Sequence, residues 1–138
     1  MKDLSNHKIK NYWNSYYKNE LKNFKNSDFS KFVLKKLKQK TSLIDIGCGN
    51  GRDSFFFSKN KIDTIGLDSS KKIININNFY LKEKKINHLK FLLLDINSNK
   101  AFSKKFDYIY VRFFVHAVTS KTELALFKFI KKIKKKIL

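Results

Sequence analysis

Apolar and polar positions along the chain predict β-strands that alternate with helices. Short apolar runs are typical of buried strands, and apolar residues that recur every three or four positions are typical of amphipathic helices. Four strands are predicted at residues 42–46, about 62–67, about 90–94 and about 107–111. Helices are predicted at residues 9–26, 29–37, 52–59, after Ser70 and after Ser120. Such alternation predicts an α/β fold with a doubly wound parallel sheet.

Three of the helices carry start signals. Ser27 or Asp28 is a suitable N-cap for the helix at 29–37, and Ser69 and Ser70 precede the next long helix. Apolar faces are expected at Phe29, Phe32, Val33 and Leu37 in the first helix, and at Ile73, Ile76 and Tyr80 in the second. The run from Ser120 to Glu123 has the spacing of a capping box, which predicts Ser120 as an N-cap. In that last helix the positions expected inward are Leu126, Phe127, Ile130 and Ile133.

The most informative stretch runs from Leu43 to Ser54, where an apolar strand enters a glycine-rich turn before a helix. Glycines let backbone approach a ligand closely, and the first N–H groups of the following helix point toward it. The spacing is G-x-G-x-G, preceded by Asp45. A dinucleotide fingerprint would need a third glycine where this chain has Arg52, so a nicotinamide-dependent dehydrogenase is disfavoured.

This loop resembles motif I of the class I S-adenosylmethionine-dependent methyltransferases, and the resemblance extends over residues 41–118. Residues 62–68 look like the second strand of that family and end in Asp68, 19 positions after Gly49. Residues 91–95 look like the third strand, ending in Asp95, and residues 106–111 look like the fourth. The resemblance implies a Rossmann-like fold and S-adenosyl-L-methionine as the cofactor, with S-adenosyl-L-homocysteine as the product.

The resemblance also implies which residues bind the cofactor. Asp45 would hold its amino end, Asp68 would accept the ribose hydroxyls, and Asp95 would approach the adenine. The implied cofactor-binding set is Asp45, Gly47, Cys48, Gly49, Gly51, Arg52, Asp68, Ser69, Asp95 and Ile96. Structural alternatives stay open: a tight turn without a ligand for the glycines, a loop anchor for Asp45, and an N-cap for Asp68.

Arg52, Arg112 and His116 are the other candidates for chemistry. Arg52 can offer a planar fork to the cofactor's carboxylate or to Asp45, or it can face solvent. Arg112 and His116 follow the fourth strand, where a methyl acceptor is expected, so they are the catalytic candidates. Arg112 can hold an anionic acceptor, and His116 has a suitable unperturbed pKa for a general base. A core or capping role for His116 is equally open.

Near the N-terminus, Trp13, Tyr16 and Tyr17 recur at helical spacing. In the family an N-terminal helix often folds over the cofactor, where aromatic rings would interact with the sulfonium charge. Ordinary core packing of an amphipathic helix explains the same pattern.

Composition adds limits. The 138 residues predict one domain, divided into a helical cap (1–40), a cofactor-binding core (41–118) and a helix with a basic tail (119–138). No apolar run reaches the roughly 18 residues of a membrane span. Cys48 is the single cysteine, which favours a reducing, cytoplasmic location. No cluster of metal ligands is evident, so no metal site is predicted.

The net charge of +20 suggests nucleic acid as a partner, but the kinds of basic residue in the chain weaken that inference. Of the 31 basic residues two are arginine, Arg52 and Arg112, and the rest are lysine. Lysine, asparagine, isoleucine, phenylalanine and tyrosine share A/T-rich codons, so compositional bias explains the charge as well.

The family's sheet has seven strands in the order 3-2-1-4-5-7-6, whereas this sequence ends after the helix that follows strand four. The sequence therefore predicts a truncated fold that retains the cofactor site and leaves strand four as an edge open to self-association. The predicted function is methyl transfer to a small-molecule or sugar-type acceptor. The alternatives are a nucleic-acid methyltransferase and a non-catalytic cofactor-binding remnant.

Overall fold

A computed structural model describes residues 7–8, 11–12, 15, 25–98, 100, 102–112 and 117–135. The predicted roles of Trp13, Tyr16, Tyr17 and His116 therefore fall outside the described residues.

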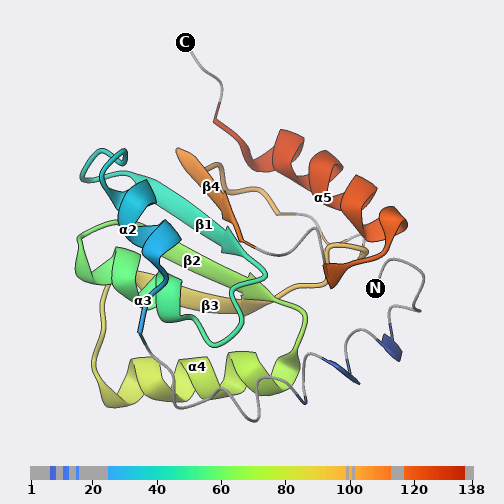
Figure 1. Cartoon of the computed structure of the whole chain (residues 1–138), viewed down its shortest axis with the longest axis horizontal. Helices are drawn as coiled ribbons and strands as arrows, with labels where there is room; N and C mark the ends of the chain where they lie inside the picture. The colour runs from blue at the N-terminus through green and yellow to red at the C-terminus, as the bar shows by residue number, and fades with distance from the viewer. Residues whose placement is uncertain are drawn as a thin grey trace.

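The described core is one parallel sheet with helices on both faces (Figure 1). Its elements are α2 (Asp28–Leu34), β1 (Ser42–Ile46), α3 (Arg52–Lys59), β2 (Asp63–Asp68), α4 (Lys71–Glu83), β3 (Leu89–Leu93), β4 (Tyr108–Val111) and α5 (Ser120–Ile133). All three strand pairings are parallel, and the strand order is β3-β2-β1-β4. The predicted α/β class and its four strands are confirmed, with strand bounds displaced by one residue or less at most ends.

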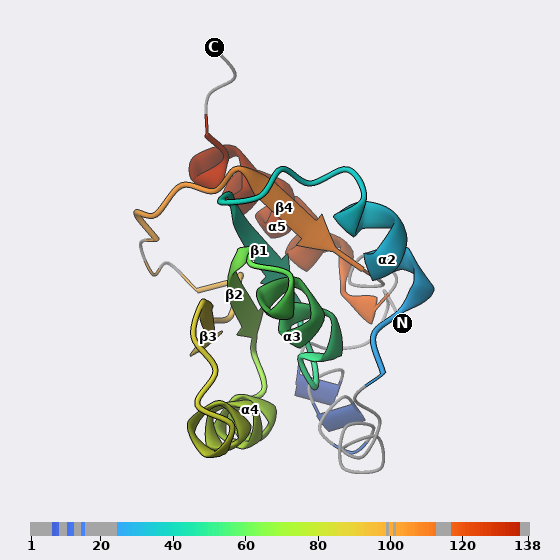
Figure 2. The same cartoon turned by 90° about the vertical axis from the view of Figure 1, so that its left-hand side faces the viewer.

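The side chains of β1 divide between the two faces because successive strand residues point in opposite directions. Ile44 and Ile46 pack in one cluster with Leu126 and Ile133 of α5. Leu43 packs on the opposite face, in a cluster with Phe57 of α3 and with residues of α2. Figures 1 and 2 accordingly place α2 and α3 on the other side of the sheet from α5.

Helix starts follow the hydroxyl residues, with one correction. Ser27 Oγ accepts a hydrogen bond from Ser30 N at 3.1 Å and caps α2. The last helix begins at Ser120, and its N-cap is Thr119, whose Oγ accepts from Thr122 N at 3.2 Å. The predicted capping box is wrong because Thr119 supplies the same hydroxyl one residue earlier, which leaves Ser120 already helical.

Three predicted core aromatic residues are exposed instead: Phe29, Phe32 and Phe127. In α5 the buried face follows Leu126 and Ile133, and Phe127 lies about 100° further round the helix. Phe29 and Phe32 stack on each other on the outer side of the short helix α2. These residues share helical spacing with the core positions, but their side chains remain exposed, although Phe29 also stacks on Tyr110 of β4.

The chain after α5 returns to the sheet beside the segment that precedes β4. Phe106 N donates to Ile133 O at 2.8 Å, and Lys135 N donates to Phe106 O at 3.1 Å. Phe106 and Lys134 thereby form a parallel bridge on this edge. Self-association through the edge of β4 stays a prediction.

Within the described ranges, no helix combines the length and the apolar character that a membrane crossing requires.

Candidate functional site

The glycine loop lies at the carboxyl end of β1 and leads into α3 (Figure 1). Gly47, Gly49 and Gly51 have φ angles of 72°, 55° and 75°, in the left-handed region that favours glycine. The amides of Gly47 and Cys48 both donate to Leu67 O, at 2.8 and 2.9 Å. The loop is therefore tied to the end of the neighbouring strand β2.

Asp68 holds the middle of the loop. Its Oδ2 accepts from Gly49 N at 3.0 Å, and its Oδ1 accepts from Ser70 N at 2.9 Å. Asn77 of α4 donates from Nδ2 to Gly49 O at 2.8 Å, so both polar groups of that glycine are engaged. The N-cap of α4 is Ser70, not Asp68. Asp68 is half-buried at the carboxyl end of β2.

Gly51 turns the chain, and it also allows a side chain of β3 to pack against the loop. A Cβ at this position would lie 2.5 Å from Phe91 Cζ of β3, closer than any real contact. The aromatic ring of Phe91 therefore sits directly against the loop backbone, which explains the third glycine without a ligand.

Asp45 is a buried carboxylic acid near the end of β1, with 3% of its surface exposed. Ser54 Oγ of α3 donates to its Oδ2 at 2.6 Å. Burial raises the pKa of Asp45 to about 7, because the single hydroxyl donor offsets little of the desolvation of the charged form. The hydrogen-bond partner of Asp45 is thus Ser54 and not Arg52.

Asp53, two positions into the first turn of α3, is nearly as buried, with 5% exposure. Its carboxylate accepts three hydrogen bonds: Ser27 N to Oδ1 at 2.7 Å, Ser27 Oγ to Oδ2 at 2.8 Å, and Tyr110 OH to Oδ2 at 2.7 Å. Burial by itself would raise the pKa of Asp53, but these donors and the nearby Arg112 lower it. Asp53 therefore joins α3 to the segment before α2 and to β4.

The sequence reasoning did not select Asp53, Ser27 or Tyr110 for this role. Their positions lie in three separate segments, and no spacing rule connects them. The available signal was an acid in a predicted helix, followed by Ser54 and three phenylalanines. The phenylalanines indicate a buried helix, and a buried carboxylate needs hydrogen-bond donors. Asn77 gave a similar signal. It lies four positions after the buried Ile73, which places its polar side chain on the buried face of the same helix.

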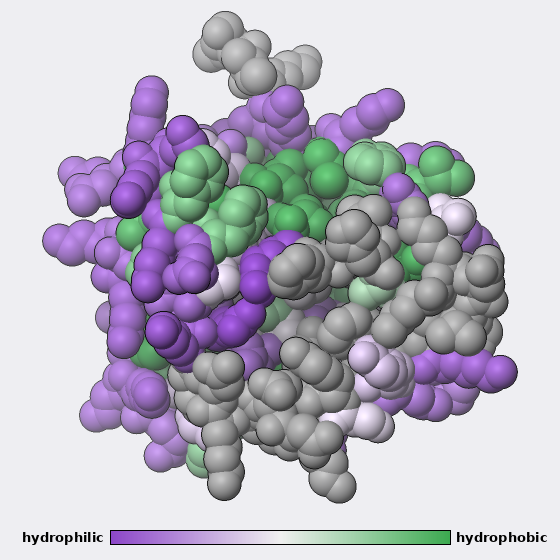
Figure 3. Space-filling model, in the orientation of Figure 1, coloured by the Kyte–Doolittle hydropathy of each residue, from purple (hydrophilic) through white to green (hydrophobic). Residues whose placement is uncertain are grey.

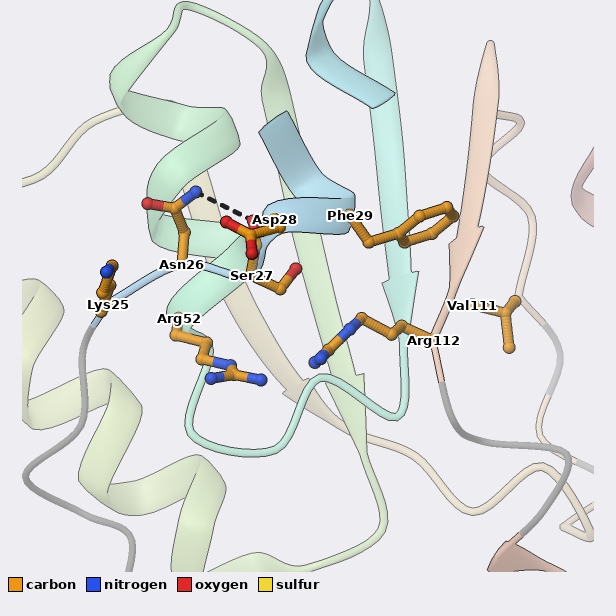
Figure 4. A pocket seen from close by; sticks show the side chains of 8 residues that line it. All are labelled: Lys25, Asn26, Ser27, Asp28, Phe29, Arg52, Val111 and Arg112. Carbon is orange, nitrogen blue, oxygen red and sulfur yellow. Dashed lines mark hydrogen bonds between the residues drawn. The ribbon is translucent and has the colours of Figure 1, made fainter. Parts of the chain in front are cut away.

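An open cavity of about 640 Å³ lies beyond the carboxyl ends of β1 and β4. Arg52 enters it from the start of α3 and Arg112 from the residue after β4, and their guanidinium groups point toward one another (Figure 4). The lining residues are Lys25, Asn26, Ser27, Asp28, Phe29, Arg52, Val111 and Arg112. The strand order reverses between β1 and β4, and α/β sheets bind ligands at such a switch point.

The surface over this region is mixed. The face drawn in Figure 3 shows strongly hydrophilic side chains near its centre, with a hydrophobic area adjoining them. Phe29 of α2 lines the cavity with exposed aromatic surface, and its ring stacks on Tyr110 with centroids 5.6 Å apart. The cavity therefore combines cationic groups with an aromatic side.

The remaining predicted cofactor residues lie along the carboxyl edge of the sheet. Leu94 N donates to Asp68 O at 3.0 Å, which brings the chain after β3 beside the end of β2. Asp95 is exposed, and its Oδ1 accepts from Asn97 N at 2.9 Å in a local turn. Ile96 is half-buried against the core. Burial raises the pKa of the Cys48 thiol, so this side chain is neutral.

The fold and the loop place the chain among Rossmann-like α/β proteins with a glycine loop after the first strand. Residues 37–136 match the family model described as a methyltransferase domain. The chain belongs to this methyltransferase family, and the resemblance seen in the sequence is confirmed.

Solved structures show the same fold. TehB from Haemophilus influenzae is 21% identical, with a TM-score of 0.68 over 80% of this chain and 37% of that one. PKMT2 from Rickettsia typhi, solved in complex with AdoHcy, is 26% identical, with a TM-score of 0.60 over 69% of this chain and 19% of that one. Coclaurine N-methyltransferase, bound to N-methylheliamine and SAH, is 19% identical, with a TM-score of 0.66 over 78% of this chain and 32% of that one.

This chain thus spans less than half the length of each of these three proteins. A search of the curated proteins finds no matching sequence.

Proposed function

We propose that this chain binds S-adenosyl-L-methionine at the glycine loop and transfers its methyl group to a small-molecule or sugar-type acceptor. The observation that carries the proposal is the pairing of Gly49 with Asp68. A half-buried carboxylate is held 3.0 Å from the loop amide at the end of β2, the position at which this family places the acid that accepts the ribose hydroxyls. Membership of the methyltransferase family supports the same reaction.

The residues of the loop fit the chemical groups of such a cofactor. Asp45 has a pKa of about 7, so a cationic amino group beside it would draw it into the charged form. Gly47 and Gly49 present backbone without side chains, and Asp95 and Ile96 continue the same edge toward the adenine side. The cofactor itself would supply the electrophilic methyl group on a sulfonium.

The protein's contribution to methyl transfer is then mainly alignment, since the displacement needs nucleophile, carbon and leaving sulfur in line. The cavity between the ends of β1 and β4 is where the acceptor would lie. Its volume of about 640 Å³ suits a small molecule. Among the structural neighbours, coclaurine N-methyltransferase was solved with the small molecule N-methylheliamine.

Two alternatives remain predictions. A nucleic-acid acceptor has the net charge of +20 in its favour, and it would show strongly salt-dependent binding. A non-catalytic remnant would bind the cofactor without transferring its methyl group. A cytoplasmic location also stays a prediction.

Calorimetric titration with S-adenosylhomocysteine, with NADH as the control ligand, tests the proposal. We expect micromolar binding of the first and none of the second. Asp68→Ala should weaken binding about 10- to 100-fold, the range for hydrogen bonds to a charged group. The matched control is Asp63→Ala at the opposite end of β2, where the acid is exposed and pairs with Lys104.

A folded chain that ignores S-adenosylhomocysteine would overturn the cofactor assignment. Equal losses in Asp68→Ala and Asp63→Ala would show that Asp68 has no special part in binding. Tight binding without methylation of any hydroxyl, amine or carboxylate acceptor in a broad panel would favour the remnant.

A further inference from the structure

The two arginines of this chain line one cavity. Arg52 and Arg112 are 60 positions apart, and the other 29 of the 31 basic residues are lysines. Both guanidinium groups nevertheless point into the same space and toward one another (Figure 4). A chain that uses lysine almost everywhere thus carries arginine at the two facing positions of a single site.

The charges around this cavity leave a positive excess. Lys25, Arg52 and Arg112 line it, against one lining acid, Asp28. The side chain of Asp28 is 98% exposed and lies 3.7 Å from Lys31 of its own helix. No ion pair joins Arg52 to another residue within the described ranges.

The nearest buried acids reduce this excess but do not abolish it. Asp53 is charged and acts electrostatically on Arg112, while its oxygens accept hydrogen bonds from Ser27 and Tyr110. Asp45 also faces Arg112 electrostatically, and its raised pKa of about 7 leaves it partly protonated at neutral pH.

Arginine differs from lysine in offering a rigid planar fork. Two parallel N–H groups match the two oxygens of a carboxylate or phosphate, whereas lysine acts as a point charge. Two forks that point into the same space can bind one such anion between them. Asn26 and Ser27 add polar groups to the same wall, and Asp53 holds that wall in place through both hydrogen bonds to Ser27.

We propose that Arg52 and Arg112 together bind an oxyanion, a carboxylate or phosphate group carried by the methyl acceptor. The inference rests on the proposed function and specifies its substrate class. The cavity sits at the switch point between β1 and β4, beside the glycine loop, so an acceptor anchored there would reach toward the cofactor. The shared chemistry has a second source, the cofactor's own carboxylate, and the experiment separates the two.

Side-chain nitrogen-15 NMR offers a direct test, because a protein with two arginines shows two Nε–Hε signals. Arg52→Lys and Arg112→Lys assign them. Inorganic phosphate, and then acetate, is titrated into the full chain at constant ionic strength. Both signals should follow one saturable curve with a common dissociation constant. Arg112→Lys, which keeps the charge and loses the fork, should weaken phosphate binding at Arg52 at least tenfold.

The matched control is Lys72→Gln on the exposed side of α4, which removes one positive charge at a residue that does not line the cavity and should leave the curve unchanged. The amide spectrum of each variant must superimpose on that of the parent chain away from the cavity. Signals that move separately, or linearly without saturation, would overturn the proposal. So would an equal loss of phosphate binding in Lys72→Gln.

A second titration with S-adenosylhomocysteine present identifies the source of the anion. Phosphate binding that survives saturating S-adenosylhomocysteine supports the acceptor site. Displacement by S-adenosylhomocysteine but not by 5′-methylthioadenosine, which lacks the carboxylate, would assign the arginines to the cofactor and overturn the proposal. If S-adenosylhomocysteine fails to bind while phosphate moves both signals, the proposed function fails and the acceptor assignment falls with it, although the anion site itself stands.

Discussion

Asp45 and Asp53 lie at the two ends of the glycine loop, and each is almost completely buried. The net pKa shifts of their carboxyl groups are nevertheless opposite. The pKa of Asp45 is raised to about 7, whereas the pKa of Asp53 is lowered. Asp45 has one hydroxyl donor, Ser54, and Asp53 has three donors from two other segments.

The comparison shows that hydrogen-bond donors act together with depth of burial to set the charge of these acids. A carboxylate that gains several hydrogen bonds regains much of the solvation it loses on burial, and one with a single donor does not. The loop thus begins at an acid that is easily neutralised and ends at one that stays charged. The first is the acid that we propose for the cofactor's amino end, and the second supports the cavity wall.

The largest expected effect comes from Asp45→Asn. A folded-state pKa of about 7 lies above the ordinary 3.8, so stability contributed by the protonated form is fully present below about pH 4 and is lost as pH rises through 7. At 1.36 kcal/mol per pKa unit, the loss is on the order of 4 kcal/mol. Urea unfolding from pH 4 to 8 should show it in the parent chain and not in the variant.

The difference between the two pH curves removes the contribution of the histidines, which both proteins share. Parallel curves would mean that Asp45 is charged in the folded chain, and the contrast with Asp53 would disappear.

Asp53→Ala tests the other acid, with an expected loss of about 3 kcal/mol at pH 7. The substitution leaves the buried donors of Ser27 and Tyr110 without their acceptor. Its folded pKa is lowered, so its stabilisation is present above about pH 4 and fades as pH falls through the folded value. Urea unfolding at pH 7 and below pH 4 measures both effects. Asp28→Ala, an exposed acid of the same region, should change little.

Gly51→Ala should destabilise the chain by about 2 kcal/mol, since it combines a φ of 75° with a Cβ 2.5 Å from Phe91. Gly51 is the N-cap of α3, whose first turn carries Asp53 and Ser54. Because Ser54 donates to Asp45, the surroundings of both Asp45 and Asp53 would be disturbed together. Thermal unfolding of Gly51→Ala, Phe91→Leu and the double variant forms a cycle. Strict additivity would contradict the packing explanation.

Ser54→Ala is the smallest change, about 1 kcal/mol at pH 8. Asp45 would lose its donor, so its pKa should rise further and the midpoint of the pH–stability curve should move upward. The control is Ser58→Ala on the same helix, which loses a hydrogen bond to Asn87 O but has no acid partner. Ser58→Ala should lower stability without moving that midpoint; equal midpoints in both variants would reject the role of Ser54.

Much of the fold follows from local sequence. The strand positions, the glycine loop and the caps at Ser27 and Ser70 depend on neighbours in the chain, which is why periodicity and spacing predict them. The cap at Thr119 and the exposure of Phe127 were predicted wrongly. In each case two neighbouring residues fit the local pattern equally well: Thr119 and Ser120 as the cap, and Leu126 and Phe127 as the buried position. The local pattern does not distinguish between them.

The sequence by itself determined the order of strands and helices, the left-handed glycine turn and the acid that ends β2, since each depends on a short run of residues. Tertiary structure alone decided that Ser27, Asp53 and Tyr110 share one hydrogen-bond cluster and that Arg52 and Arg112 meet in one cavity. These groups lie far apart in the chain. Their charges and partners depend on which strand ends become neighbours, and the pairing of β4 with β1 establishes that.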